Sequence, residues 1–239
     1  MYRRLLYAAS LGALVGVMPA RGSAQSGSAA VPTTFSIYLA GGNTYSVAPA
    51  NGGGLSPFLV TLLAGTGRVL RVNATGTGSF CPGATCATTS PDGPAATLPT
   101  TNLNASGKIS GIIASNSGFL AGVFIGPTLP SVAPATLNFG SLDFLTLSPL
   151  LGQQFFIGDG FTSTSVQQQF FIPDNAIALY FGIADGGAFF GNPDFYGDNA
   201  GTYTARYDVT STVPEPATLL LLTAGLLAMA TTARRRRLM

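Results

Sequence analysis

The feature that most constrains this 239-residue chain is a series of short apolar or alternating runs, broken by Gly, Pro, Asn and Asp. In the run at 68–75, Leu70 and Val72 fall on one face, whereas Arg71 and Asn73 fall on the other. A period of two is typical of a half-buried β-strand. No stretch between the two ends shows a capped helical stripe, and Gly and Pro punctuate the runs. The pattern therefore predicts an all-β sandwich or barrel.

The other expected strands follow the same pattern, at 34–40, 58–64, 118–126, 142–147, 153–160, 166–173, 176–185 and 202–210. Two aromatic runs, "QQFFIGDGF" and "QQQFFIP", are interpreted as two paired core strands, with a turn at Asp159 between the flanking apolar residues. The Gly/Pro-rich segments 81–107 and 127–138 are expected to be long loops.

The first 24 residues predict a secretory signal peptide. Arg3 and Arg4 precede an apolar run from Leu5 to Met18, and small residues lead up to Ala24. The alternative, a transmembrane helix, is less favoured because the run is shorter than the roughly 20 residues that a span needs.

The C-terminal residues 214–239 have a different organisation. Pro214 and Pro216 interrupt any helix, and the uncharged stretch 217–233 that follows is long enough to cross a bilayer as a helix. A cluster of four arginines comes next and is expected to hold that end in the cytoplasm. The cluster consists of Arg234, Arg235, Arg236 and Arg237.

Together these C-terminal features resemble the PEP-CTERM sorting signal, with Val213, Pro214, Glu215 and Pro216 as its short motif. The resemblance implies an exported protein, transiently anchored in the inner membrane by helix 217–233. It also implies cleavage near the motif by a membrane transpeptidase of the exosortase type. Release or transfer to the cell surface, in cells that make extracellular polysaccharide, would follow. A permanent tail anchor is the alternative, and Glu215 is assigned to recognition by the sorting enzyme.

Residues 25–213 remain as one domain of ordinary size. It holds four basic residues against eight Asp, a formal charge of −4, which argues against nucleic acid as a partner. Cys81 and Cys86 bracket "CPGATC", and export makes a local disulfide the expected state. The chain has no His and the domain has no Glu, so a Ser/His or Cys/His nucleophile is excluded and an enzyme is not expected.

The acidic loop before the last expected strand is a candidate calcium site. Asp185, Asp198 and Asn199, with a backbone oxygen from Phe195, offer the oxygen ligands that Ca²⁺ prefers. Glycines allow such a loop to fold tightly enough to aim several oxygens inward. The alternative is ordinary turn chemistry, since Asp and Asn side chains also cap their own backbone.

The segments "AIALYFGIAD" and "FYGDNAGTYTARYDV" resemble the C-terminal part of the small calcium-dependent galactose-binding lectins of bacteria. The resemblance runs roughly from Leu55 to Val209, with clear motif identity in the last 35 residues. It implies a jelly-roll-like β-sandwich in which Asp185 is the first carboxylate ligand, and Asp198 and Asn199 form a ligand pair. Backbone oxygens of Phe195 and Phe80 would complete the set, and the ion would bind two vicinal sugar hydroxyls.

The chain departs from that family in its longer loop, which adds Asp194 as a further candidate ligand, and in having neither His nor Trp. Phe189, Phe190 and Tyr196 are the candidates to replace the missing aromatic contact with a sugar. We therefore expect a non-catalytic, surface-sorted binding module that depends on Ca²⁺ and binds carbohydrate of the extracellular polysaccharide matrix. The alternatives are a structural matrix or sheath protein without a specific ligand and, less favoured, a sugar hydrolase that uses two Asp.

Overall fold

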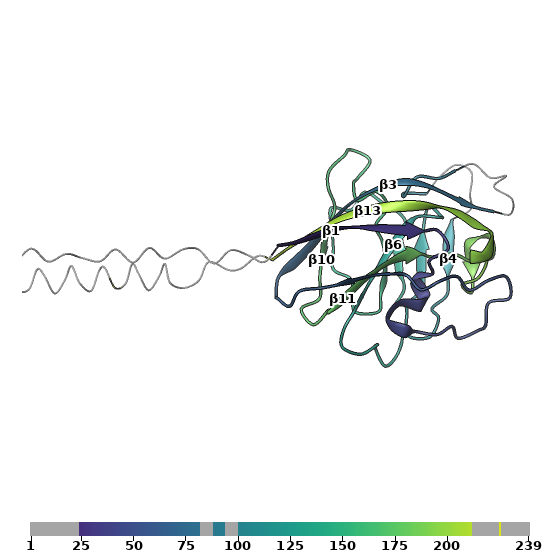
Figure 1. Cartoon of the computed structure of the whole chain (residues 1–239), viewed down its shortest axis with the longest axis horizontal. Helices are drawn as coiled ribbons and strands as arrows, with labels where there is room; N and C mark the ends of the chain where they lie inside the picture. Colours follow the sequence, from purple (N-terminus) through teal and green to yellow (C-terminus); the bar gives the residue numbers. More distant parts are fainter. Residues whose placement is uncertain (1–23, 82–87, 94–99, 212–224, 226–239) are drawn as a thin grey trace, which may run out of the picture. The chain divides into compact units, whose positions relative to one another are not determined.

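The computed structural model describes residues 24–81, 88–93, 100–211 and 225 (Figure 1). Contacts divide the chain into one unit of Gly22–Thr212 and another of Met1–Arg21 with Val213–Met239. All strands that the structure describes belong to the first unit, and the description below concerns that unit alone.

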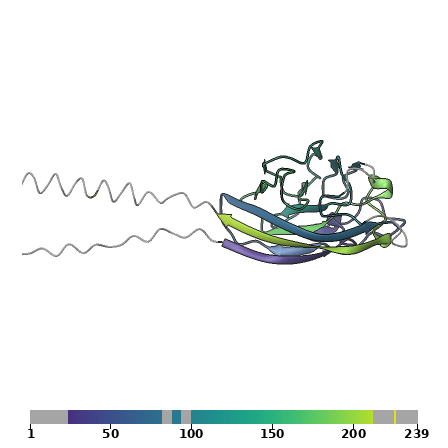
Figure 2. The same cartoon turned by 90° about the horizontal axis from the view of Figure 1, so that it is seen from above.

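The largest sheet is built on three long strands that form one curved layer (Figure 2). β13 pairs antiparallel with both β1 and β3, and the β13–β3 ladder runs unbroken from Asn199 opposite Phe80 to Ser211 opposite Arg68. The alternation expected at 68–75 is confirmed, because Val72 is buried while Asn73 is exposed. The order of this sheet is β1 (Ala24–Pro32), β13 (Asn199–Ser211), β3 (Arg68–Phe80), β10 (Gln169–Phe171) and β8 (Thr146–Leu147).

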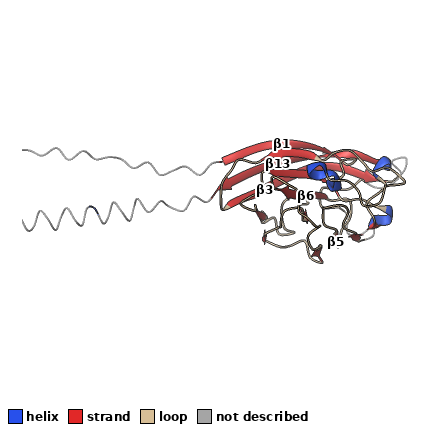
Figure 3. Ribbon diagram, turned by 90° about the horizontal axis from the view of Figure 1, so that it is seen from below, coloured by secondary structure: helices blue, strands red, loops and turns tan. Residues whose placement is uncertain are grey.

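Two smaller sheets, of four strands each, complete the domain. One has the order β2 (Phe58–Thr61), β11 (Ala178–Ile183), β6 (Leu120–Ile125) and β9 (Gln154–Phe156). The other has the order β12 (Phe190–Gly191), β4 (Thr101–Leu103), β5 (Ile112–Ala114) and β7 (Leu137–Phe139). Within the described residues of this unit the helices are short 3₁₀ turns (Figure 3): η1 (Ile37–Gly42), η3 (Gly187–Phe189) and η4 (Tyr196–Asp198).

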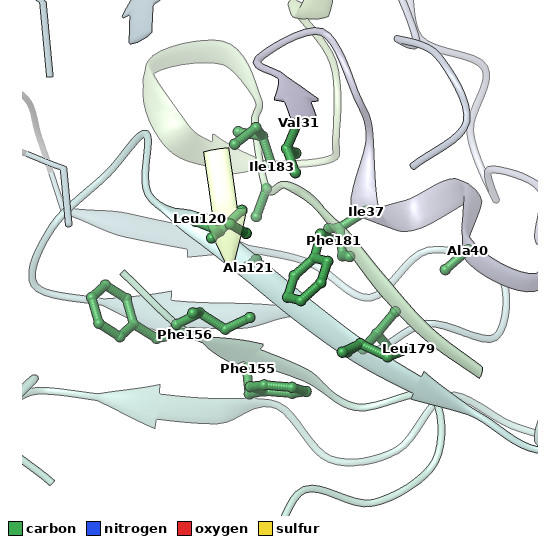
Figure 4. Packing of buried hydrophobic residues seen from close by; sticks show 14 of the residues in the cluster. Val31, Ile37, Ala40, Leu120, Ala121, Phe155, Phe156, Leu179, Phe181 and Ile183 are labelled. Atoms are coloured by element: carbon green, nitrogen blue, oxygen red, sulfur yellow. The ribbon is translucent and has the colours of Figure 1, made fainter. Parts of the chain in front are cut away.

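The hydrophobic core lies where these sheets meet. Every residue of β6 is buried, which explains its nearly continuous apolar sequence. Figure 4 shows side chains of β6, β9 and β11 meeting those of η1 and β1 in this core. Phe124 stacks on Phe155 at a centroid distance of 5.0 Å, and Phe155 contacts Phe170 of the large sheet at 5.2 Å. These contacts join the two sheets through aromatic packing.

The prediction of an all-β domain is confirmed, with three sheets in place of the two of a simple sandwich. Three local predictions are wrong, and the first is the long loop expected at 81–107, which contains β4. The strand expected at 34–40 gives way to η1, which kinks at Gly41, where φ is +65°. The two aromatic runs are not paired with each other, because β9 and β10 belong to different sheets. Their Phe residues meet by packing across the core and not by hydrogen bonding along a ladder.

β13 runs from one end of the domain to the other. Ser211, the last residue of β13, lies near the start of β1, where Ala24 pairs with Thr210 (Figure 1). Asn199, the first residue of β13, lies at the opposite end, beside the loop that follows β11. A strand of 13 residues spans about 40 Å at roughly 3.3 Å per residue. The candidate acidic loop is therefore far from the point where the chain leaves the sheet.

Candidate functional site

The acidic loop joins β11 to β13 and is anchored by the buried side chain of Tyr196. The Tyr196 hydroxyl donates to the carbonyl of Ile183 at 3.0 Å and accepts from the backbone N–H of Asp185 at 3.1 Å. These two bonds tie η4 to the end of β11. The loop therefore returns on itself and brings residues 185 and 199 together, although they are 14 positions apart.

Asp185 and Asn199 form the centre of the candidate site. The side-chain amide of Asn199 donates to Asp185 Oδ2 at 2.7 Å and to the Thr33 carbonyl at 2.9 Å. The other carboxylate oxygen of Asp185 accepts from the backbone N–H of Gly186 at 2.7 Å. Asp185 is only 3% exposed and Asn199 only 8% exposed. The contact with Thr33 was not anticipated from the sequence, because it depends on the pairing of β1 with β13.

The environment of Asp185 disfavours its charged form. Burial raises the pKa of Asp185 to about 8. The hydrogen bonds from Asn199 and Gly186 oppose this shift, whereas the nearby charges of Asp198 and Asp194 add to it. A carboxyl group at this position is therefore mostly protonated at neutral pH unless a cation offsets the cost of burying its charge.

Two further buried oxygens in this cluster lack a hydrogen-bond donor. They are Oδ1 of Asp198 and Oδ1 of Asn199. Buried acceptors without a partner are rare in proteins, because each one carries the full cost of desolvation. Amide and carboxylate oxygens are the chemical type of ligand that Ca²⁺ prefers, and these two atoms and the Asp185 carboxylate are of that type.

The two predicted backbone ligands lie on the elements that adjoin this cluster. Phe80 is directly opposite Asn199 in the β3–β13 ladder. Phe195 precedes Tyr196 and has a left-handed backbone, with φ of +67°. Within residues 24–81, 88–93 and 100–211, no three Asp, Glu, His or Cys side chains gather in an arrangement that could hold a metal ion. A cation here would thus depend on amide and backbone oxygens as well as on carboxylates.

Asp194 has a different role from the further ligand that the sequence suggested. Its carboxylate accepts four hydrogen bonds, from the backbone N–H groups of Asn51, Phe195 and Ala50 at 2.7, 2.8 and 3.2 Å, and from the Asn51 side chain at 3.0 Å. Although desolvation raises the pKa of Asp194, these bonds outweigh it and leave the pKa below its usual value. With its oxygens engaged in this way, Asp194 fastens the 50–51 segment to the acidic loop.

The aromatic residues of the loop divide into buried and exposed members. Phe189 is 4% exposed and packs edge-on against Phe80 at 5.9 Å. Tyr196 is 1% exposed, so neither of these two rings presents a face to a sugar, contrary to the prediction. Phe190 is 67% exposed, and the ring of Phe195, predicted only as a backbone ligand, is 37% exposed. The backbone is left-handed at residues 188, 189 and 195, close to both exposed rings, and the sequence pattern did not reveal this conformation.

Several predicted features fall outside the described residues. Cys86 is among them, so its disulfide with Cys81 stays a prediction. The signal peptide, the Val-Pro-Glu-Pro motif, the arginine cluster and the predicted span 217–233, apart from Gly225, also lie outside them. Within the part of the chain that is described, no helix is long and apolar enough to cross a membrane.

Comparison with known families identifies the C-terminal segment. Residues 212–237 match the family described as the PEP-CTERM protein-sorting motif, which confirms the sorting signal predicted at this end. The match implies an exported, membrane-sorted protein that exosortase processes. No curated protein sequence and no solved structure matches the chain. The resemblance of the domain to the calcium-dependent lectins therefore stays a prediction.

Proposed function

We propose that the exported domain is a non-catalytic binding module that holds Ca²⁺ through the side chains of Asp185, Asp198 and Asn199. The observation that carries this proposal is the pair of buried oxygens without donors, Asp198 Oδ1 and Asn199 Oδ1, next to a buried carboxyl group. A cation supplies the missing positive charge to all three groups. In this arrangement Phe80 and Phe195 contribute backbone oxygens.

The chemistry of these ligands favours calcium over a transition metal. They comprise carboxylate, amide and backbone oxygens, and the chain has no His. Ca²⁺ takes six to eight oxygens, and these five residues supply about five when each carboxylate binds through one oxygen, which leaves coordination positions for an external ligand.

We further propose that this external ligand is a carbohydrate of the extracellular polysaccharide matrix, held by two vicinal hydroxyls on the ion, as in the jelly-roll lectins that the sequence resembles. The exposed rings of Phe190 and Phe195 offer apolar contact to the sugar.

The position of the site in the fold suits a surface-sorted binding module. The acidic loop lies at the start of β13, whereas the sorting motif begins at residue 212, directly after the last residue of that strand. The length of β13 therefore separates the binding loop from the point of attachment. A ligand can reach the loop while the C-terminal end is anchored to the membrane or joined to the cell surface.

A structural role without a ligand is the second candidate. The Asp185–Asn199 hydrogen bond favours it, because a protonated Asp185 is already partly satisfied without an ion. The loop would then serve to close one end of the sheet.

Calorimetric titration of the full-length chain with Ca²⁺ separates the two candidates. If the domain is a calcium-binding module, Ca²⁺ binding is saturable and is lost in the Asp198→Asn variant. The control variant Asp174→Asn keeps it, because Asp174 lies at the other end of the domain, where its carboxylate accepts from the backbone N–H of Gly67. The binding module also predicts retention on polysaccharide beads that a chelator abolishes. Binding of Ca²⁺ without any glycan retention would refute the carbohydrate part alone, and absence of Ca²⁺ binding would leave the structural role.

A further inference from the structure

Three large apolar side chains are exposed at the end of the domain opposite the acidic loop. Leu63 is 54% exposed, Phe171 42% and Ile177 49%. They come from the connection after β2, from the end of β10 and from the residue before β11. We call this set the apolar rim. Because each side chain is large and half exposed, the rim presents apolar surface to whatever lies beyond this end of the domain.

The buried side chain of Arg68 holds the rim together. Its guanidinium donates to the carbonyl of Leu63, a rim residue, at 2.7 Å, and to the carbonyl of Ala176, the residue before Ile177, at 2.9 Å. One side chain therefore fixes the backbone at two of the three rim positions. It also donates to the carbonyls of Pro173 and Asp174, and the Arg68 carbonyl accepts from the backbone N–H that follows Phe171. Arg68 is only 2% exposed, so its charge is directed into the protein, while the exposed carboxylate of Asp174 accepts from the backbone N–H of Gly67 beside the rim.

The rim also lies where the chain leaves the domain. Arg68 is paired with Ser211, the last residue of β13. Only residues 212–216 separate Ser211 from the uncharged stretch that begins at Ala217. Five residues span at most about 18 Å when fully extended. The polar layer on each side of a bilayer is roughly 5–8 Å thick, so such a tether keeps this end of the domain close to the lipid.

We propose that the apolar rim inserts into the interface of the bilayer in which the sorting segment is anchored. Leu63, Phe171 and Ile177 then seat the domain on the membrane and hold residues 212–216 at the membrane surface, within reach of a membrane-embedded sorting enzyme. Three side chains bind a membrane only weakly without a second anchor, so the domain detaches after the tail is cut. This inference depends on the sorting step and not on the calcium site.

The absence of tryptophan from the chain allows a direct test, because a single introduced Trp is the only one present. Phe171→Trp reports on the rim, and Phe190→Trp is a matched control, since both are exposed phenylalanines at opposite ends of the domain. The full-length chain is placed in nanodiscs made with brominated phospholipid, which quenches Trp fluorescence at short range. We expect at least threefold stronger quenching for Phe171→Trp than for Phe190→Trp.

A second variant tests the contribution of the rest of the rim. Adding Leu63→Ser and Ile177→Ser to Phe171→Trp is expected to reduce the quenching to the level of Phe190→Trp while the circular dichroism spectrum is retained. Equal quenching of the two single Trp variants would overturn the proposal. So would an emission shift of Phe171→Trp that depends on protein concentration and not on lipid, since that result would assign the rim to contact with a second copy.

Discussion

The raised pKa of Asp185 makes a quantitative prediction about stability in the absence of metal. In the unfolded chain an aspartate titrates near 4, whereas burial raises the pKa of Asp185 to about 8 in the folded domain. Between these values the folded state keeps a proton that the unfolded state has lost. Unfolding therefore releases a proton, and the free energy of unfolding falls as pH rises through this window. This contribution is complete below about pH 4 and is lost above about pH 8.

The magnitude follows from the same linkage. A full proton of difference corresponds to about 1.4 kcal/mol per pH unit, and the slope halves as the pH reaches the folded pKa. Between pH 6 and pH 8 the loss for Asp185 is therefore about 2 kcal/mol. Burial also raises the pKa of Asp92, to about 6, and this carboxyl group adds a slope of the same sign at lower pH. Above pH 6 only about 0.4 kcal/mol of the Asp92 contribution remains, so most of the loss up to pH 8 comes from Asp185.

Urea unfolding of the full-length chain in a chelator, at intervals between pH 6 and pH 8, measures this loss. Asp185→Asn is the matched control, because an amide at this position does not titrate and is close to isosteric with the protonated acid. We expect the unfolding free energy of the variant to be nearly constant over this range, whereas that of the natural chain falls. Parallel curves for the two proteins would refute the assignment of a neutral Asp185 to the folded state.

Three further results are expected from the same region. Binding of Ca²⁺ at pH 7 should release close to one proton from Asp185, about nine-tenths of which is protonated at that pH, as measured by calorimetry in two buffers of different ionisation enthalpy; identical heats in both buffers would exclude this proton. Asp194→Ala should speed amide exchange around Asn51 without changing Ca²⁺ affinity, and a loss of affinity would restore Asp194 as a ligand. Phe189→Ala should lower the unfolding free energy by about 3–5 kcal/mol, whereas Phe190→Ala should change it by less than about 0.5 kcal/mol in urea unfolding; similar costs would show that the burial of these rings is misassigned.

The sequence predicted the strands whose two faces differ clearly. Leu70 and Asn73 of β3 follow a period of two, and the runs that became β6 and β11 are apolar enough to identify a buried strand. β1 escaped prediction because "AQSGSAAVP" has small side chains and low strand propensity. It is a strand because β13 pairs with it along its whole length, a contact between residues nearly 180 positions apart that leaves no local pattern.

The candidate site was predicted only in part, because the sequence shows the types of residue in the loop but not the distant residues that they contact. Acidic residues in a Gly-rich loop indicated oxygen ligands, and the structure brings Asp185 and Asn199 into hydrogen-bonding contact. The sequence could not distinguish Asp194, which bonds to a distant loop, from a residue directed at the cluster. Likewise, adjacent Phe189 and Phe190 look equivalent in the sequence. In the structure the backbone is left-handed at residues 188 and 189, and the ring of Phe189 is buried whereas that of Phe190 is exposed.

Terbium luminescence tests the convergence of these oxygens on one ion most directly. Tb³⁺ replaces Ca²⁺ at oxygen sites, and a nearby tyrosine sensitises its emission. The hydroxyl of Tyr196 contacts the backbone N–H of Asp185, which places a sensitiser beside the site in a chain that has no tryptophan. Excitation of tyrosine in the full-length chain should give Tb³⁺ emission that Ca²⁺ displaces and that Asp198→Asn removes. Emission that is absent, or that persists unchanged in Asp198→Asn, would contradict a cation held by Asp185, Asp198 and Asn199.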